Sequence, residues 1–248
     1  MRTKVLICAA ALAAASAFTS MAQNVYSLNI VGYINIPLVD GFNLVANQLD
    51  FDGTGLNNTP ANILGTNLPV NTAIYGWAQP GSWNIAAYTH NRSTGLDAWG
   101  VSAGSMPTLN PGQGFWLSIP PGGSATINSN LTVVGQVDQG AGFAVNTNLA
   151  TPSGFSLLSS IVPMAGRITS DLDYSPVLGD TVYQWNTSPA GWTINNYVHN
   201  RALNTNAWSL STGPTGAPDE PTFSVGEGFW LASGVGASWS NYFDLSSQ

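Results

Sequence analysis

The amino-acid sequence predicts an all-β fold made of two tandem repeats, which form sandwich-like or barrel-like lobes packed together. Three observations support this prediction. Apolar and polar residues alternate in short segments, turn-forming residues separate these segments, and one ordered set of sequence blocks occurs twice. Many short strands with frequent turns are typical of sandwiches and barrels.

The alternation is clearest from Tyr26 to Ile36, where the apolar even positions are Leu28, Ile30, Ile34 and Ile36 and the polar odd positions are Ser27, Asn29 and Asn35. A period of two indicates a strand with one buried face. Further strands are expected at 41–49, 72–78, 83–89, 113–119 and 131–137, with counterparts in the second half. Pro, Gly and Asn clusters between them, such as Pro120-Pro121-Gly122-Gly123, favour turns. Short helical turns are expected only near 61–64 and 168–172.

The repeat is carried by blocks that recur in the same order, with only small changes in spacing. The matching pairs are 41–45 with 154–158, 74–77 with 182–185, Trp83 with Trp192, 88–92 with 197–201, Trp99 with Trp208, and 107–118 with 221–232. Val31-Gly32 is matched upstream by Val134-Gly135, which places the junction near residue 136. We therefore expect a first β repeat at 23–136 and a second at 137–248.

Residues 1–22 have the pattern of a secretory signal peptide. Arg2 and Lys4 precede an apolar run from Val5 to Phe18, and Ser20-Met21-Ala22 offers a small-x-small cleavage site. The run is too short to span a bilayer. We expect a secreted protein at the cell surface, outside the cell or in the periplasm, with no membrane span in the mature chain.

The net negative charge of the chain limits the classes of partner that are expected. The chain has twelve acidic and five basic residues, and cleavage would remove two of the basic ones together with the single cysteine. The mature chain would then be free of cysteine and carry a net charge of −9. An acidic surface repels phosphate backbones and anionic lipids, so nucleic-acid and membrane-surface binding are disfavoured. Self-association and extracellular polysaccharide remain as candidate partners.

Each repeat contains a His-Asn-Arg tripeptide between two tryptophans. The candidate ligand-binding residues are Trp83, His90, Arg92, Trp99, Trp192, His199, Arg201 and Trp208. In a functional interpretation, the Arg and His donors hold an anion or a sugar hydroxyl. In a structural interpretation, the tripeptide ends a strand, Asn forms the turn, and Arg stacks on tryptophan or pairs with Asp97. Core packing is likewise the simpler role for Trp77, Trp83 and Trp99.

Two further motifs have structural interpretations. Gly-x-Gly-Phe-Trp at 112–116 and 226–230 lacks the lysine and helix of a phosphate loop, and predicts a bend with the aromatic pair filling the core. Asp50, Asp52, Asp171 and Asp173 are calcium candidates. They lack the full spacing of a calcium loop, so a solvated turn is the alternative.

No catalytic constellation can be assembled from the mature chain, which has no Cys, no Lys and one His per repeat. A pair of glycosidase carboxylates is possible among twelve acids, but their placement singles out none. We therefore expect a protein that is not an enzyme and needs no cofactor.

The blocks VYSLNIVGYINIP, GFNLVANQL, GQGFWLS, VVGQVDQG, GFSLLSSIVP and VGEGFWL resemble a family of secreted proteins from Verrucomicrobia and neighbouring environmental bacteria. The resemblance covers essentially the whole mature chain. It implies export and a β architecture, and it supplies no activity, cofactor or catalytic residue.

The function expected first is that of a secreted structural or surface-associated protein of the cell envelope or extracellular matrix, acting by packing or self-association. The alternative is an extracellular carbohydrate-binding module that uses exposed tryptophans and the His-Asn-Arg turns. A hydrolase is the third hypothesis.

Overall fold

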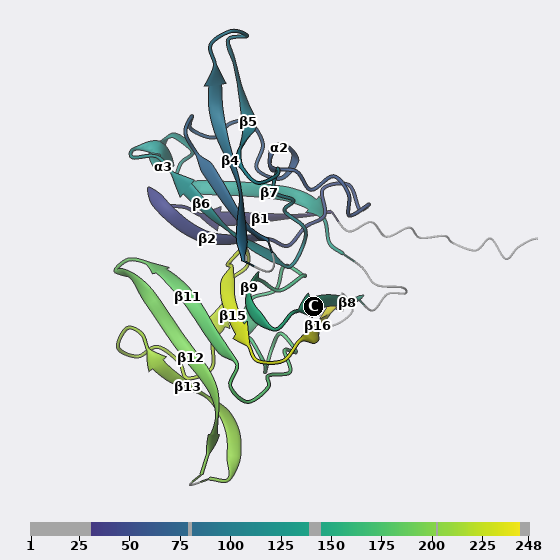
Figure 1. Ribbon diagram of the computed structural model, residues 1–248, viewed down its shortest axis with the longest axis vertical. Coiled ribbons are helices and arrows are strands. Elements are labelled where there is room, and N and C mark those ends of the chain that lie inside the picture. The colour runs from purple at the N-terminus through teal and green to yellow at the C-terminus, as the bar shows by residue number, and fades with distance from the viewer. Residues whose placement is uncertain (1–30, 79–80, 139–144, 202, 244–248) are drawn as a thin grey trace, which may run out of the picture.

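The computed structural model describes residues 31–78, 81–138, 145–201 and 203–243, and these residues form an all-β protein (Figure 1). The prediction that the fold is all-β is therefore confirmed. The expected signal peptide and residues 26–30 of the first expected strand lie outside the described residues. Among the described residues, no helix is long and apolar enough to cross a membrane.

Residues 31–136 contribute seven strands and two short helices. They are β1 (Val31–Pro37), β2 (Gly41–Asn47), α2 (Pro60–Ile63), β3 (Ala73–Ala78), β4 (Ser82–Asn91), β5 (Leu96–Ala103), β6 (Gln113–Ile119), α3 (Gly123–Thr126) and β7 (Asn130–Gln136). The expected helical turn at 61–64 corresponds to α2, in which Pro60 begins the helix and Thr59 caps it.

Residues 145–243 contribute the remaining strands. They are β8 (Val145–Thr151), β9 (Gly154–Leu158), β10 (Gly166–Arg167), β11 (Thr181–Thr187), β12 (Ala190–Asn200), β13 (Thr205–Thr212), β14 (Thr222–Phe223), β15 (Phe229–Ser233) and β16 (Ala237–Phe243). The expected boundary after residue 136 coincides with the end of β7.

Ten strands form one sheet, in the order β13-β12-β11-β15-β9-β6-β3-β4-β5, with β2 also paired to β6. The two halves of this sheet meet at its centre, where β6 pairs with β9 at Gln113 and Leu158. A second bridge joins Val45 to Glu227. Backbone bonds from Ser159 N–H to Gly112 O and from Ala46 N–H to Gly226 O reinforce this centre.

Each pairing in one half of the sheet has a counterpart in the other. β3 pairs with β4 and β6, as β11 pairs with β12 and β15. β4 pairs with β5 and β12 with β13, and both pairs contain a register shift at equivalent positions, Ile85/Ala86 and Ile194/Asn195. The separate ribbons β1–β7 and β8–β16 correspond in the same way. The strand pairings of the two halves thus correspond to one another across the centre of the sheet.

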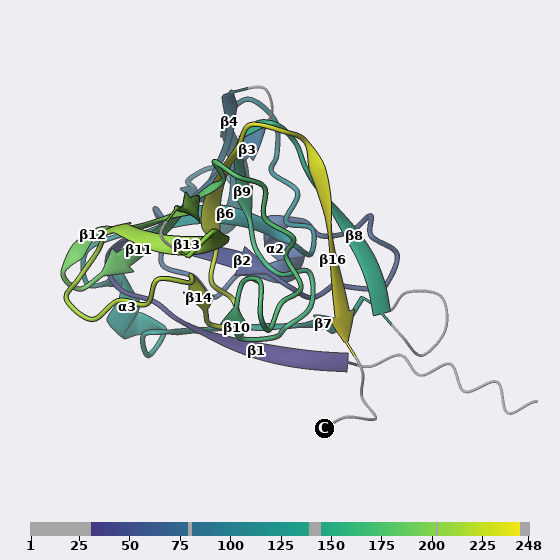
Figure 2. The ribbon, with the colours of Figure 1, turned by 90° about the horizontal axis from the view of Figure 1, so that it is seen from below.

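Alternating burial explains why the ribbons lie against one face of the sheet. In β7, Leu131 and Val133 are buried while Thr132 and Val134 are exposed, as the period-two pattern requires. In Figure 2, the β1–β7 ribbon runs along the bottom of the view, and the β8–β16 ribbon lies at its right. Two hydrophobic cores result, one centred on Phe115 and one on Phe229. The opposite face of the sheet is left open.

β5 and β13 were not among the expected strands. Most of their residues are exposed, so no buried stripe produces an alternating pattern. With β4 and β12, they form the two hairpins that extend to opposite ends of the long axis (Figure 1).

Candidate functional site

Aromatic rings line the face of the ten-stranded sheet that the β1–β7 and β8–β16 ribbons leave uncovered. In β6, Phe115 points into a core and is 1% exposed, so its neighbour Trp116 must point to the opposite face. The same alternation separates buried Ile74 from half-buried Tyr75 in β3. A strand pattern that builds a core on one side therefore places aromatic side chains on the other.

Ten residues form this aromatic face, five from each half of the chain. They are Phe42, Tyr75, Trp77, Trp83, Trp116, Phe155, Tyr183, Trp185, Trp192 and Trp230. Trp77 lies opposite Trp83 in the β3–β4 register, and Trp185 lies opposite Trp192 in the β11–β12 register. Half of the surface of Phe42 and of Phe155 is exposed. The remaining eight rings are partly buried against one another.

The rings contact one another edge to face. The centroids of Trp77 and Trp83 are 5.0 Å apart at 70°, and those of Trp77 and Trp230 are 5.1 Å apart at 79°. In the other half, Trp185 and Trp192 are 5.1 Å apart at 66°. Edge-to-face contacts are favourable for the ring quadrupoles, and they leave hollows between upright rings.

Two such hollows open on the aromatic face, with volumes of about 360 and about 400 Å³. The first is lined by Trp77, Trp83, Phe155, Tyr183, Trp192 and Trp230. The second is lined by Phe42, Tyr75, Trp83, Trp116, Trp185 and Trp192. Each residue of one hollow occupies the strand position that matches a residue of the other hollow. Trp83 and Trp192 line both.

Hydrogen bonds from two indoles tie the halves together across this face. Trp77 Nε1 donates to the backbone oxygen of Phe155 at 3.0 Å, and Trp185 Nε1 donates to that of Phe42 at 3.1 Å. These reciprocal bonds fix the two rings and the backbone beneath both phenylalanines. The aromatic face therefore forms only when the two halves are packed together.

The other four indoles of the aromatic face donate no hydrogen bond to a described residue. Among the described residues, no acceptor is found for Nε1 of Trp83, Trp116, Trp192 or Trp230. None of these nitrogens is among the buried atoms without a partner, so all four reach solvent. Apolar rings and unpaired N–H donors therefore occur side by side. Of the residues that the structure describes, no titratable side chain other than the two tyrosines lines either hollow.

The expected site residues fall into three groups. Trp83 and Trp192 belong to the aromatic face and do not fill a core, so the expected core role of Trp77 and Trp83 is wrong. Trp99 packs against the first core and donates to Gly65 O at 3.1 Å. Trp208 is 7% exposed, packs in the second core and donates to Thr169 Oγ1 at 2.8 Å.

The His-Asn-Arg tripeptides end β4 and β12 at the far ends of the two hairpins. His90 Nδ1 lies 2.6 Å from Asp97 Oδ1, and His199 Nδ1 lies 2.8 Å from Asn206 Oδ1. Arg92 and Arg201 are exposed in the adjoining turns. Because the hairpins point to opposite ends of the molecule (Figure 1), the structure does not bring the tripeptides together. Asp97 pairs with His90, where the structural interpretation gave it to arginine.

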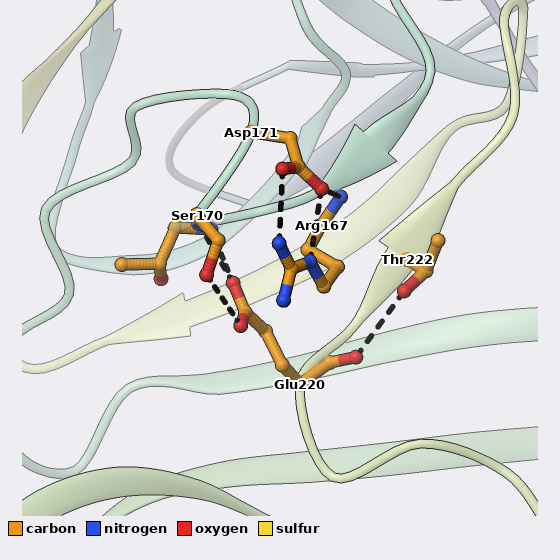
Figure 3. Close-up of polar contacts among 6 residues, drawn as sticks. Arg167, Ser170, Asp171, Glu220 and Thr222 are labelled. Carbon is orange, nitrogen blue, oxygen red and sulfur yellow. Dashed lines mark hydrogen bonds and ion pairs between the residues drawn. The ribbon is translucent and has the colours of Figure 1, made fainter.

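Four aspartates were calcium candidates, and hydrogen bonds occupy the oxygens of three of them. Asp50 accepts from Gly55 N–H and Asp52 from Thr54 N–H, as in capped turns. Asp171 binds Arg167 through both oxygens (Figure 3), and these bonds lower its pKa to about 2. Asp173 has a left-handed φ of 60° in the following turn. The described residues contain no group of three or more His, Cys, Asp or Glu that could hold a metal.

The Gly-x-Gly motifs lie where the halves meet. Gly112 and Gly226 have φ of 83° and 80°, as expected of a tight turn. A Cβ on Gly228 would lie 2.6 Å from Val45 O, so this strand crossing requires glycine. Behind the motif, only Phe115 and Phe229 fill the cores. Trp116 and Trp230 point to the aromatic face, which corrects the expectation that both aromatic residues are buried.

The aromatic face as a whole was missed from the sequence, although Trp83 and Trp192 were named. The available signal was the repeated alternation of an aromatic residue with a smaller or buried one, as in Tyr75-Gly76-Trp77 and Tyr183-Gln184-Trp185. Pairing of β3 with β6, distant in sequence, was needed to show that these rings share one surface. No protein-family model matches the chain, and searches of the curated proteins and of the solved structures returned no match.

Proposed function

We propose that this protein is a secreted, non-enzymatic, surface-associated β protein that binds extracellular polysaccharide through its aromatic face. The observation that supports this proposal is the pair of ring-lined hollows, open to solvent and edged by unpaired indole N–H donors. Large exposed apolar patches on soluble proteins mark interaction sites. The proposal includes export by residues 1–22, origin by duplication, and membership of the environmental family that the sequence resembles.

Sugar rings fit this surface because they present two kinds of group. Their C–H faces are apolar and pack on the faces of aromatic rings, whose quadrupole is negative there. Their hydroxyl oxygens accept hydrogen bonds, which the free indoles of Trp83, Trp116, Trp192 and Trp230 offer. A shallow site leaves the other hydroxyls in water, so no polar group is buried without a partner.

The chemistry of the hollows supports binding without catalysis. Hydrolysis of a glycosidic bond ordinarily uses two carboxyl groups across the sugar. Only aromatic side chains line the hollows, and the histidines lie at the hairpin ends, away from this face. The protein would therefore hold a polysaccharide and leave it intact.

Trp83→Ala and Trp192→Ala test the proposal, because these two residues line both hollows. Pull-down on insoluble cellulose, chitin and xylan, with depletion isotherms, should show binding by the unchanged protein. Each substitution should weaken it about tenfold or more, since aromatic anchors at interfaces are worth about 2 kcal/mol. The double variant should not bind measurably.

His90→Ala and His199→Ala are matched controls at the hairpin ends and should bind as the unchanged protein does. Far-ultraviolet circular dichroism of every variant establishes that the fold is kept. Failure of the unchanged protein to bind any polysaccharide would contradict the proposal. So would loss of binding in the histidine variants with retention in the tryptophan variants.

A further inference from the structure

The ten-stranded sheet ends in two edge strands, β5 and β13. They occupy matching positions in the topology but differ in how well they are protected against pairing with another chain. β5 pairs with β4 alone and β13 with β12 alone, and they lie at opposite ends of the molecule (Figure 1). An edge strand presents unpaired N–H and C=O groups to solvent. Natural proteins cover or charge such edges to prevent pairing with other chains.

The loop of residues 213–220 caps the β13 edge at Leu210. Leu210 N–H, which points away from β12, donates to Asp219 Oδ1 at 3.1 Å. Asn195 in β12 holds the loop, because its Nδ2 donates to the oxygens of Pro218 and Asp219. An aspartate is thereby fixed beside the outward N–H of β13.

Glu220 anchors the same loop from the other side. Its carboxylate accepts from the N–H groups of Thr169 and Ser170 at 2.9 and 2.8 Å, and from Ser170 Oγ at 2.8 Å. Figure 3 shows Glu220 reaching Ser170 beside the Arg167–Asp171 pair. Three independent attachments therefore hold the cover in place.

The β5 edge has no equivalent cover. The corresponding loop is only residues 104–106, and it turns inward, with Ser105 N–H donating to Asn84 Oδ1 at 3.0 Å. Buried Ala86 stands where β12 has Asn195, so the amide that would hold a longer loop is missing. Val101 is the counterpart of Leu210, and no acceptor outside the strand pairing is found for its N–H among the described residues.

The residues of β5 do not protect this edge against pairing with another chain. Its eight residues, Leu96–Ala103, include no proline and no lysine, and Asp97 is its one charge. Val101 is 51% exposed and Leu96 is 67% exposed. Because outward N–H groups recur every second residue, the backbone N–H groups of Asp97, Trp99 and Val101 all point away from β4.

We propose that β5 is a self-pairing edge, at which a second copy of this chain adds its own β5 in antiparallel orientation. A two-fold axis at Trp99 places Asp97 of each chain opposite Val101 of the other, so the two carboxylates do not face each other. One interface then satisfies both open edges, as a closed two-fold dimer requires. The loop that caps β13 at Leu210 disfavours the same pairing at the other edge, so the expected assembly is a dimer.

Val101→Pro tests this proposal, because it removes an outward donor without removing a bond to β4. Sedimentation equilibrium of the purified protein, from about 1 µM to about 1 mM, should show a monomer–dimer equilibrium. Val101→Pro and Val101→Glu should each raise the dimer dissociation constant at least about tenfold, the glutamate by placing a carboxylate directly opposite Asp97 of the other chain. Val101→Ala keeps the N–H and should leave the dimer intact.

Amide hydrogen exchange locates the interface. The Trp99 and Val101 amides should exchange more slowly as the concentration of the unchanged protein rises, and the Leu210 amide should not change. A protein that stays monomeric over the whole range overturns the proposal. A folded Val101→Pro variant with undiminished dimerisation, or protection confined to the aromatic face, also overturns it. None of these outcomes depends on polysaccharide binding.

Discussion

At the scale of single residues, the two halves differ at Gln113 and Glu227, which are a neutral amide in one half and a carboxyl group in the other. Both follow the first glycine of a Gly-x-Gly motif, and both accept a hydrogen bond from a backbone N–H three residues earlier. Glu227 also accepts from Gln184 Nε2 at 3.2 Å. Burial nevertheless raises the pKa of the Glu227 carboxyl above its ordinary value of 4.5, because removal from water penalises the charged form.

This raised pKa predicts how stability depends on pH. A carboxyl whose pKa is higher in the folded state stabilises the protein fully below its unfolded value of 4.5, and that contribution disappears as the pH rises through the folded value. Relative to the unchanged protein, Glu227→Gln should therefore become more stable from pH 4 to pH 8. Melting temperatures across this range measure the trend. A difference that stays constant or reverses would show that Glu227 is not the titrating group.

At the scale of elements, much of the architecture was predictable, because burial of one strand face leaves a period-two pattern. β1, β2, β3, β4, β6 and β7 each lie within or close to an expected segment. β5 and β13 have no buried face and left no such signal. The aromatic face was not predicted for another reason. Trp116 lies between buried Phe115 and Leu117, and the local sequence does not show which face of the sheet each aromatic ring occupies.

The crossing of β2, β6 and β15 at the sheet centre depends on glycine at position 228. A Cβ there would meet Val45 O at 2.6 Å and Val45 C at 3.1 Å, and backbone atoms cannot move aside as a flexible side chain can. Gly228→Ala should lower the free energy of unfolding by about 1–3 kcal/mol, the usual cost of overpacking. Gly191→Ala in β12 is the matched control, because nothing lies within 4 Å of its added Cβ.

Chemical denaturation of the two variants gives the comparison directly. The Gly191→Ala protein should unfold at the same denaturant concentration as the unchanged protein, or slightly higher. Equal stability of the two variants would mean that the strands at the centre separate more easily than their geometry indicates.

At the scale of the whole molecule, the sequence indicated two similar halves but not how they join. The junction includes backbone contacts at Gly112 and Gly226, indole bonds to backbone oxygens, and ring contacts such as Trp77–Trp230 and Trp116–Trp185. These contacts join residues far apart in the sequence, so no local pattern predicts them. Because the same aromatic residues build the candidate site and the junction, binding at the hollows and the packing of the halves are physically linked.

The reciprocal bonds of Trp77 and Trp185 should therefore make the halves unfold as one unit. Trp77→Phe and Trp185→Phe keep an aromatic ring but remove the N–H that reaches the other half, and each should cost about 1 kcal/mol. The double variant should lose about 2 kcal/mol. Tyr75→Phe, which removes a polar group from the same face without removing a bond between the halves, should have little effect.

Circular dichroism and tryptophan fluorescence should give coincident unfolding curves for the unchanged protein. Two separate transitions would mean that each hydrophobic core is stable alone and that the indole bonds do not couple them.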